Sequence, residues 1–559
     1  MDVEMSSGAA GAVPKLEHPP PAREARRRRV LLVAGLVALP LLAFFALGRE
    51  SASTVWEMAS AKLTAMNDAA GNATGGRADE LLGRLLAQGM NRRSCRSRYE
   101  TWRYYKQFPY APSPHLLRTL RAYEARHRRC APGTPLYARS VEQLRSGRSA
   151  DDEAVECRYI VWLPFDGLGN RMLSMVSGFL YALLTGRVFL VALPPDSADL
   201  FCEPFPGTTW LLPLEDFPVA NLFGLGHNPE QSYTRLLHSK KIVVDSDPAA
   251  KNATAPPVPA YVYLSLGYQL TDRLFFCGEH QLALGKVNWL LLYSDLYFVP
   301  SLYPIAGFRD ELRRLFPARE SASHLLLRYL LHPTNPVWGL VTRYYHAYLA
   351  PATRRIGVQV RMFGFASVPV DDMYNQILAC SRLERVLPEI DGGGEAAAAA
   401  GTSSKTSTAI LIASLYPDYY ERLRARYYEH AAAKGGGGWV GVFQPTHEER
   451  QATESLAHNQ RALAEIYLLS FSEALLTSGL STFGYVSSSL AGVRPAILLT
   501  AFHHKVPATP CRRAVSMEPC NLTPPRGVEC RRGTAVDGDD VARHVRVCED
   551  FQDGVKLFH

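Results

Sequence analysis

The chain has 559 residues, of which 47% are hydrophobic and 20% are charged, so its composition excludes a wholly disordered protein. Its formal charge of +8 comes from 61 lysines and arginines against 53 acidic residues. Four arginines stand together at 26–29, directly before an apolar stretch, so the basic charge alone does not indicate a nucleic-acid-binding protein. A chain of this length can form two domains once its ends are set aside.

The apolar stretch covers residues 30–48 and contains no charged side chain. At about 1.5 Å per residue, a helix of that length just crosses a hydrocarbon core of about 30 Å. We expect an uncleaved transmembrane signal-anchor, with a cleaved signal peptide as the alternative. The arginine cluster assigns residues 1–29 to a cytosolic tail, so the rest of the chain is expected to be lumenal and to begin with a stem at 49–91.

Cysteine usage agrees with an oxidising, lumenal compartment. All ten cysteines follow the apolar stretch, and none forms a CxxC pair of the kind found in metal and redox sites. Four of them lie in the segment 511–559, which we expect to be a disulfide-stapled tail whose pairing the spacing leaves open. Three sequons predict N-glycosylation at Asn72, Asn252 and Asn521.

Between stem and tail, the hydrophobic pattern predicts two α/β domains. In the first, at 92–350, a strand at 159–163, a glycine turn, a helical segment at 172–185 and a strand at 187–193 form a βαβ unit. In the second, at 351–510, helical segments alternate with strands expected at 356–361, 409–413, 439–443, 474–477 and 496–500. Two doubly wound, Rossmann-type domains of this kind face a cleft where ligands bind. Low-complexity stretches at 392–408 and 435–438 are expected to be surface insertions.

Three short motifs have the chemistry to bind nucleotide phosphates. The segment 167–171 (GLGNR) joins a strand to a helix, where glycines admit a phosphate and Asn170 and Arg171 add a donor and a positive charge. Arg361 ends a strand, where its guanidinium can clamp a pyrophosphate. The segment 479–484 (GLSTFG) offers hydroxyl and N–H groups at a helix start. Each motif also has a purely structural interpretation: tight packing, an ion pair and a helix cap.

Asp295 is the candidate base. It lies among aromatic residues in the segment 293–300 (YSDLYFVP), where burial would raise the pKa of its carboxyl group and allow it to accept a proton. A turn or helix-capping aspartate is the structural alternative.

Two pairs of carboxylates have the spacing of a metal-binding DxD motif. Asp245 and Asp247 follow an expected strand at 242–244, and Asp537 and Asp539 lie in the tail. Such short matches arise by chance, and we expect no metal site.

Taken together, these segments resemble the plant cell-wall fucosyltransferase family whose best-known members fucosylate xyloglucan. The resemblance extends from about residue 92 to the C-terminus and follows the family's order. It rests on the segments 167–171 (GLGNR), 294–302 (SDLYFVPSL), 356–361 (IGVQVR), 414–417 (SLYP) and 481–484 (STFG).

The resemblance implies a GT-B-like fold and a metal-independent, inverting α-1,2-fucosyltransferase. The donor would be GDP-fucose, no further cofactor would be needed, and the acceptor would be O2 of a galactosyl residue in a cell-wall polysaccharide, with xyloglucan favoured. It also implies a type II Golgi membrane protein with the acceptor-side domain at 92–350 and the donor-side domain at 351–510. A homodimer or a complex with other Golgi glycosyltransferases fits this setting, and no nucleic-acid partner is expected.

The resemblance also assigns roles to individual residues. Arg361 would neutralise the donor pyrophosphate, and Asp295 would act as the base or orient the acceptor hydroxyl. The residues expected around GDP are Gly169, Asn170, Arg171, Arg361, Phe363, Ser481, Thr482, Phe483 and Gly484. An aromatic wall for an oligosaccharide, with core packing as the alternative use, would contain Tyr261, Tyr263, Tyr268, Tyr293, Tyr297 and Phe298.

Several other functions stay open from the sequence. Within plants, arabinogalactan proteins or other galactosyl and arabinosyl glycans are alternative acceptors. Met362 follows Arg361 where the wider α-1,2-fucosyltransferase group carries a second basic residue, which leaves fewer charges for the phosphates. A metal-dependent GT-A enzyme would use Asp245 and Asp247, and a protein O-fucosyltransferase shares the glycine–asparagine turn. A non-catalytic Golgi scaffold or sugar-binding protein is the alternative of another class.

Overall fold

The computed structural model describes residues 79–105, 109–149, 156–244, 257–390, 407–432, 439–530 and 543–559. The chain divides into a unit at 1–78 and a unit at 79–559, and all described residues belong to the second. The expected cytosolic tail and membrane anchor lie outside the described residues, as do Asn72, Asn252, both DxD pairs and most of the 392–408 insertion. Within the described part, no helix combines the length and the apolar character needed to cross a membrane.

The first sheet has the strand order β2-β1-β4-β3, and all its strands run parallel. Its strands are β1 (Tyr159–Leu163), β2 (Val188–Val191), β3 (Tyr261–Ser265) and β4 (Trp289–Tyr293). Both faces are covered: Ile160 and Trp162 belong to one apolar core, and Tyr159 and Val161 belong to another on the opposite side. Burial of both faces explains why the run 159–163 is apolar throughout rather than alternating.

The second sheet has the order β10-β9-β8-β5-β6-β7 and is parallel except for its edge strand β10. Its strands are β5 (Arg354–Val360), β6 (Thr408–Ser414), β7 (Val440–Phe443), β8 (Ala474–Ser478), β9 (Ala496–Leu498) and β10 (Cys511–Arg513). A separate antiparallel hairpin near the C-terminus consists of β11 (Val545–Val547) and β12 (Val555–Leu557).

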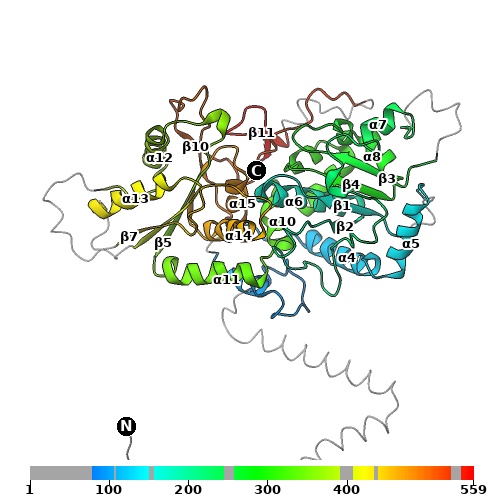
Figure 1. Ribbon diagram of the computed structural model, residues 1–559, viewed down its shortest axis with the longest axis horizontal. Coiled ribbons are helices and arrows are strands. Elements are labelled where there is room, and N and C mark those ends of the chain that lie inside the picture. Colours follow the sequence, from blue (N-terminus) through cyan, green and yellow to red (C-terminus); the bar gives the residue numbers. More distant parts are fainter. Residues whose placement is uncertain are drawn as a thin grey trace, which may run out of the picture. The chain divides into compact units, whose positions relative to one another are not determined.

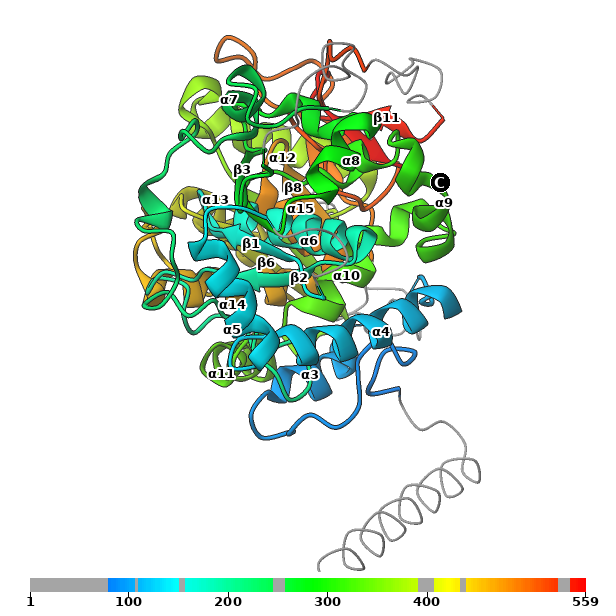
Figure 2. The same ribbon diagram turned by 90° about the vertical axis from the view of Figure 1, so that its right-hand side faces the viewer.

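Helices cover the faces of both sheets (Figure 1). Those of the first domain are α3 (Arg96–Glu100), α4 (Pro114–Cys130), α5 (Pro135–Arg145), α6 (Leu168–Thr185), α7 (Tyr233–His238), α8 (Gly278–Gly285), α9 (Ala306–Leu315), α10 (Ala322–Leu330) and α11 (Asn335–Tyr344). Those of the second are α12 (Val370–Glu384), α13 (Pro417–Glu429), α14 (Leu456–Ser470) and α15 (Thr482–Ala491). Figure 2 shows α4 and α5 beside the β1–β2 side of the first sheet.

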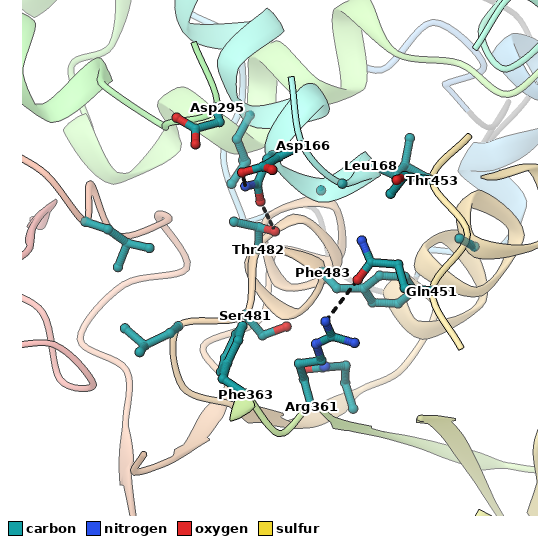
Figure 3. Close-up of a pocket in the computed structure, with 18 of the residues that line it drawn as sticks. Asp166, Leu168, Asp295, Arg361, Phe363, Gln451, Thr453, Ser481, Thr482 and Phe483 are labelled. Carbon is teal, nitrogen blue, oxygen red and sulfur yellow. Dashed lines mark hydrogen bonds between the residues drawn. The ribbon is translucent and has the colours of Figure 1, made fainter. Parts of the chain in front are cut away.

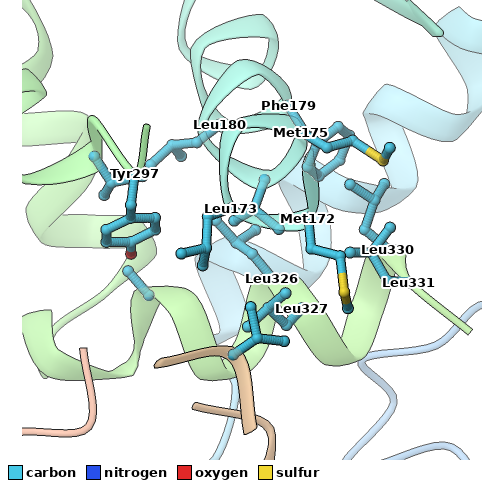
Figure 4. Packing of buried hydrophobic residues seen from close by; sticks show 14 of the residues in the cluster. Met172, Leu173, Met175, Phe179, Leu180, Tyr297, Leu326, Leu327, Leu330 and Leu331 are labelled. Atoms are coloured by element: carbon cyan, nitrogen blue, oxygen red, sulfur yellow. The ribbon is translucent and has the colours of Figure 1, made fainter. Parts of the chain in front are cut away.

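The halves built around the first and second sheets, called here the first and second domain, belong to one compact unit and share an apolar core. Helices α6 and α10 of the first domain pack against α15 of the second, and α11 packs against α14 (Figure 1). On the α6 side of this core, Met172, Leu173 and Phe179 meet Leu326 and Leu330 of α10 (Figure 4). Because this interface is continuous with the core of the first domain, it holds the loops at the carboxyl ends of both sheets in fixed relative positions.

The expected boundary of the stem at residue 91 is wrong. Leu85 and Leu86 are each 1% exposed and belong to the main apolar core, so residues 79–91 are part of the folded unit. The leucines of this segment are buried because they pack against the first domain, a contact that its Ala- and Gly-rich neighbourhood did not reveal.

The ten cysteines form five disulfides, as expected for a chain in an oxidising compartment. Cys520–Cys548 closes the tail on itself. Cys277–Cys530 joins the tail to the first domain. Cys380–Cys511 joins β10, the first strand of the tail, to α12 of the second domain. The tail is therefore tied covalently to both domains. The first domain contains Cys95–Cys202 and Cys130–Cys157.

Most predicted elements occur within a few residues of their expected bounds. The exception is residues 242–244, which do not form a strand. Strands β3 and β4 were not predicted individually, although the aromatic run that ends β4 was recognised as a site motif. Hairpin β11–β12 was also not predicted, because its short strands gain their stability from packing on the first domain.

Candidate active site

The carboxyl ends of the parallel strands in both sheets open onto one cavity of about 720 Å³. Asp166 follows β1 and Asp295 follows β4, whereas Arg361 follows β5 and Ser481 follows β8. All four residues line the cavity (Figure 3). Ligands of doubly wound sheets bind at this edge, so the cavity lies where the predicted fold places its site.

Two motifs distant in the sequence lie against each other here. Gly169 is in the first turn of α6, and a Cβ atom on it would lie 2.6 Å from Oγ1 of Thr482 in the first turn of α15. The Thr482 hydroxyl donates to Oδ1 of Asn170 over 2.6 Å. Glycine is therefore required for the two helix N-termini to approach. Because helix N-termini carry free N–H groups and partial positive charge, this wall suits a phosphate.

Arg361 supplies a fixed positive charge beside these helices. Its backbone N–H donates to Ser478 Oγ over 2.9 Å, and its Nη2 donates to Oε1 of Gln451 over 2.9 Å (Figure 3). Its guanidinium carbon lies 5.7 Å from the centre of the Phe363 ring. A guanidinium has five N–H donors, so it can bind phosphate oxygens while it keeps the bond to Gln451.

Asp295 lies across the cavity from Arg361 (Figure 3). The residue is 3% exposed, and its Oδ1 accepts a hydrogen bond from the Tyr268 backbone N–H over 2.8 Å. Burial, together with the negative charge of Asp166, raises the pKa of Asp295 to about 7. A carboxyl group with this pKa can exchange a proton near neutral pH, which suits the predicted role of a base.

The loop between β7 and α14 adds cavity residues that the sequence analysis missed. Gln451 and Thr453 of this loop line the cavity, as does the buried Glu465 of α14. Glu465 accepts hydrogen bonds from the backbone and hydroxyl of Thr446, and burial raises its pKa to about 7. The available signal was the predicted strand at 439–443, because residues that follow a parallel strand lie at the ligand-binding edge.

Two of the residues expected around GDP lie behind the cavity wall. Arg171 is bonded to Asp196 over 2.7 Å and to Ser197 over 2.6 Å, so its charge holds the loop after β2 and does not reach the cavity. Gly484 faces the sheet, where a Cβ atom would lie 2.8 Å from the Cβ of Thr477. Both residues support the wall. The other expected GDP contacts line it, namely Gly169, Asn170, Arg361, Phe363, Ser481, Thr482 and Phe483.

The predicted aromatic wall is largely a core. Tyr263, Tyr293 and Phe298 are buried in the apolar clusters, and Tyr261 is half-buried beside one of them. Tyr297 is also buried, and its hydroxyl donates to Glu518 of the tail. Tyr268 alone of the six is exposed; it lines the cavity, as does part of the buried Tyr297. The sequence pattern could not separate these residues, because strand periodicity does not show which face meets a ligand.

The structure does not support glycosylation of Asn521. This residue is fully buried, and its side-chain amide donates to Ser301 Oγ over 2.8 Å, so the folded chain offers no room for a glycan there. Among the described residues, both clusters with metal-ligand spacing contain a disulfide, Cys277–Cys530 or Cys520–Cys548, whose sulfurs offer no thiolate.

Asp550 of the tail supports the donor-side loop from behind. Its Oδ2 accepts hydrogen bonds from the Leu480 backbone N–H over 2.8 Å and from the Tyr485 hydroxyl. Leu480 has a φ of 61°, a left-handed conformation that is strained for a leucine and persists only where its surroundings enforce it. Asp550 therefore holds the turn that presents Ser481 and Thr482 to the cavity.

Replacing Asp550 by alanine is expected to weaken GDP binding about tenfold, because the strained turn that presents Ser481 and Thr482 loses the acceptor of two part-buried hydrogen bonds. Calorimetric titration of GDP and the melting temperature check this. Asp553→Ala is the control, since Asp553 forms an exposed ion pair with Arg526. Unchanged GDP affinity in a folded Asp550→Ala variant would refute the role of Asp550 in positioning.

Two doubly wound domains with phosphate-binding groups at a shared cavity have the architecture of GT-B-like glycosyltransferases. Residues 51–531 match the xyloglucan fucosyltransferase family, and the chain belongs to this family.

Galactoside 2-alpha-L-fucosyltransferase of Arabidopsis thaliana is 45% identical over 487 residues, which cover 87% of this chain and 84% of that protein. The protein of the same name from Pisum sativum is 45% identical over 482 residues, which cover 86% and 82%. A solved structure of an arginine-to-lysine mutant of Arabidopsis thaliana FUT1 in complex with GDP is similar with a TM-score of 0.74 and 43% identity. It covers 86% of this chain and 100% of that one.

Proposed function

We propose that this chain transfers L-fucose from GDP-fucose to O2 of a galactosyl residue in a cell-wall polysaccharide, with xyloglucan as the acceptor. The observation that carries the proposal is a single cavity that is lined by two helix N-termini lying against each other and has Arg361 at one end and Asp295 at the other. The names of the relatives support the galactoside acceptor and the α-1,2 linkage, and the GDP complex of the similar structure supports the donor.

On the donor side, the pyrophosphate would bind between the N-termini of α6 and α15 and the Arg361 guanidinium. Negative charge develops on the phosphate oxygen as the bond to fucose C1 breaks, and these groups would stabilise that charge. They would supply the stabilisation that a divalent cation provides in other glycosyltransferases. In this arrangement the second domain, which contributes Arg361 and α15, would be the donor side, as the resemblance implies.

On the acceptor side, the galactosyl O2 would attack C1 of fucose from the face opposite to the departing GDP. The new bond joins O2 to C1, the bond from C1 to the phosphate oxygen breaks with its electrons leaving on GDP, and the O2 proton passes to Asp295. A pKa of about 7 makes Asp295 a stronger base than an ordinary carboxylate, while part of it is still ionised near neutral pH.

We further propose that residues 30–48 anchor the chain as a single-pass type II protein of the Golgi membrane. The apolar run, the preceding arginines and the five disulfides of the remaining chain support this placement. In this arrangement, residues 1–29 are cytosolic and the cavity opens to the lumen.

The transfer reaction is tested with the full chain, purified in detergent and supplied with GDP-fucose in EDTA. We expect GDP release that depends on galactosylated xyloglucan, with degalactosylated xyloglucan as the matched inactive acceptor. GDP release only with an arabinogalactan would show that the proposed acceptor is wrong and that the proposed fucosyl transfer is right. Release only after Mn²⁺ is restored would contradict the metal-free donor site. No release with any acceptor, from folded protein, would refute the transferase.

A further inference from the structure

Two large aromatic rings stand exposed at the cavity, one on each domain. Tyr268 of the first domain is 63% exposed and Phe365 of the second is 69% exposed, and both line the cavity. Single exposed aromatic residues are common on protein surfaces and need no explanation by themselves. These two differ because each is held in place by the residues that form the reaction site.

Tyr268 is on a tight turn that is bonded to Asp295. Its backbone N–H donates to Asp295 Oδ1 over 2.8 Å, and the Leu270 N–H closes the turn by donating to the Gly267 carbonyl over 2.7 Å. A Cβ atom on Gly267 would lie 2.9 Å from Asp295 Oδ1, so glycine is needed for this approach. At the base of the turn, Asp272 exchanges two hydrogen bonds with the last residue of β3. The ring is therefore presented from a fixed backbone beside the candidate base.

Phe365 is in a short turn, Gly364–Ala366, that begins three residues after Arg361, the proposed donor-binding arginine. Its ring stacks on Phe363 with centroids 5.6 Å apart and an interplanar angle of 18°. Phe363 in turn lies beneath the guanidinium of Arg361. The stack thus leads outward from the proposed phosphate site to an exposed ring face.

An exposed aromatic face beside a hydroxyl-accepting site suits a neutral sugar. One face of a pyranose carries mostly C–H groups, and an aromatic ring buries that face while the sugar hydroxyls stay solvated. A rigid ring also binds at little cost in conformational entropy. A charged phosphate gains nothing from such a face, so the donor diphosphate is not the expected partner of Tyr268 or Phe365.

We propose that Tyr268 and Phe365 are stacking platforms for the sugar rings that flank the galactosyl residue of the acceptor chain. The acceptor passes between the two domains, with Tyr268 on the Asp295 side and Phe365 on the Arg361 side. This inference rests on the proposed function, since it concerns the acceptor of that transfer. On this proposal the two rings determine the affinity for the acceptor, whereas the groups around Arg361 determine the affinity for the donor.

The experiment compares Tyr268→Ala and Phe365→Ala with the wild-type full chain. Tyr268→Phe and Phe365→Tyr keep the rings and serve as conservative variants. Tyr428→Ala is the matched control, because Tyr428 is 90% exposed on α13 and is not among the cavity residues. The KM values for a galactosylated xyloglucan oligosaccharide and for GDP-fucose are measured for each. Binding of the same oligosaccharide to the enzyme–GDP complex is titrated separately, so that this arm needs no turnover.

Each alanine variant is expected to raise the acceptor KM and the oligosaccharide Kd about tenfold, with the KM for GDP-fucose within about twofold of wild type. The conservative variants and Tyr428→Ala should match wild type. An unchanged acceptor Kd in both alanine variants would overturn the inference, as would an equal rise in donor KM. A wild-type chain that binds the oligosaccharide without transferring fucose would refute the proposed function. The stacking platforms would then be tested by the oligosaccharide Kd values of the two alanine variants alone. A wild-type chain that neither transfers nor binds would overturn both.

Discussion

Arg361→Ala is expected to lower kcat about 10³-fold while the chain stays folded. The guanidinium lies at the cavity, bonded to Gln451 and placed beside the N-termini of α6 and α15, where leaving-group charge would develop. Removing one such preorganised donor from a transition-state site typically costs about 10²–10³ in kcat, and removing an arginine that also supplies the charge costs as much or more. Initial rates of GDP release at saturating GDP-fucose and acceptor check this.

Arg361→Lys should recover part of the loss, because an ammonium keeps the charge but not the bidentate fork. Arg422→Ala is the control, since Arg422 pairs with Asp371 on the surface and does not line the cavity. Turnover of Arg361→Ala within tenfold of wild type, with unchanged melting, would show that the leaving group is stabilised elsewhere.

Asp295→Asn is expected to lower kcat by about 10²–10⁴, the usual contribution of a general base. In the wild-type chain, activity should rise with pH through about 7, because only the ionised carboxylate can accept the acceptor proton. The variant should lose this rise. A pH profile of kcat at saturating substrates makes the measurement. A variant that keeps both its rate and the wild-type profile would exclude Asp295 as the base.

Asp166→Asn tests the cause of the raised pKa. Asp166 contributes a like charge and a hydrogen bond that favour the protonated form of Asp295, so the substitution should move the rise in activity to lower pH.

The ionisation of Asp295 also makes the stability of the folded chain depend on pH. Its pKa is higher in the fold than in the unfolded chain, so its favourable contribution is fully present below about pH 4 and is lost as pH rises through about 7. Asp295→Asn should therefore melt at a higher temperature than wild type at pH 8, whereas the two should differ less at pH 5.

Much of the site was predictable because its residues follow local patterns. The apolar run that forms β1, the glycine turn and the helix α6 are adjacent in the chain, so periodicity alone places Gly169 and Asn170 at a helix N-terminus. Arg361 likewise follows an apolar parallel strand. Asp295 stood out because a carboxylate among aromatic residues is unusual. The family resemblance rests on the same local segments.

The differences between the sequence analysis and the structure have one common cause, which is pairing between distant segments. Arg171 belongs to the same sequence motif as Asn170, yet it forms an ion pair with Asp196 behind the cavity wall. Leu85 and Leu86 lie in a segment whose sequence resembles a stem, but in the structure they are buried against the first domain. Asn521 carries a sequon that is chemically complete, but Ser301 and the tail bury it. None of these partners can be inferred from spacing along the chain.

The amino-acid sequence by itself determined the α/β class with its two sets of parallel strands, the oxidised cysteines and the identity of the groups suited to phosphate and proton chemistry. These depend on side-chain type and on periods of two to four residues, which are local properties. Only the tertiary structure decided which of those groups share a cavity. The bond between Asn170 and Thr482 spans 312 residues of chain, and that between Asp550 and Leu480 spans 70. Such contacts form because the apolar faces of α6, α10, α14 and α15 must be buried together, and that requirement, rather than any local pattern, brings the two helix N-termini to one point.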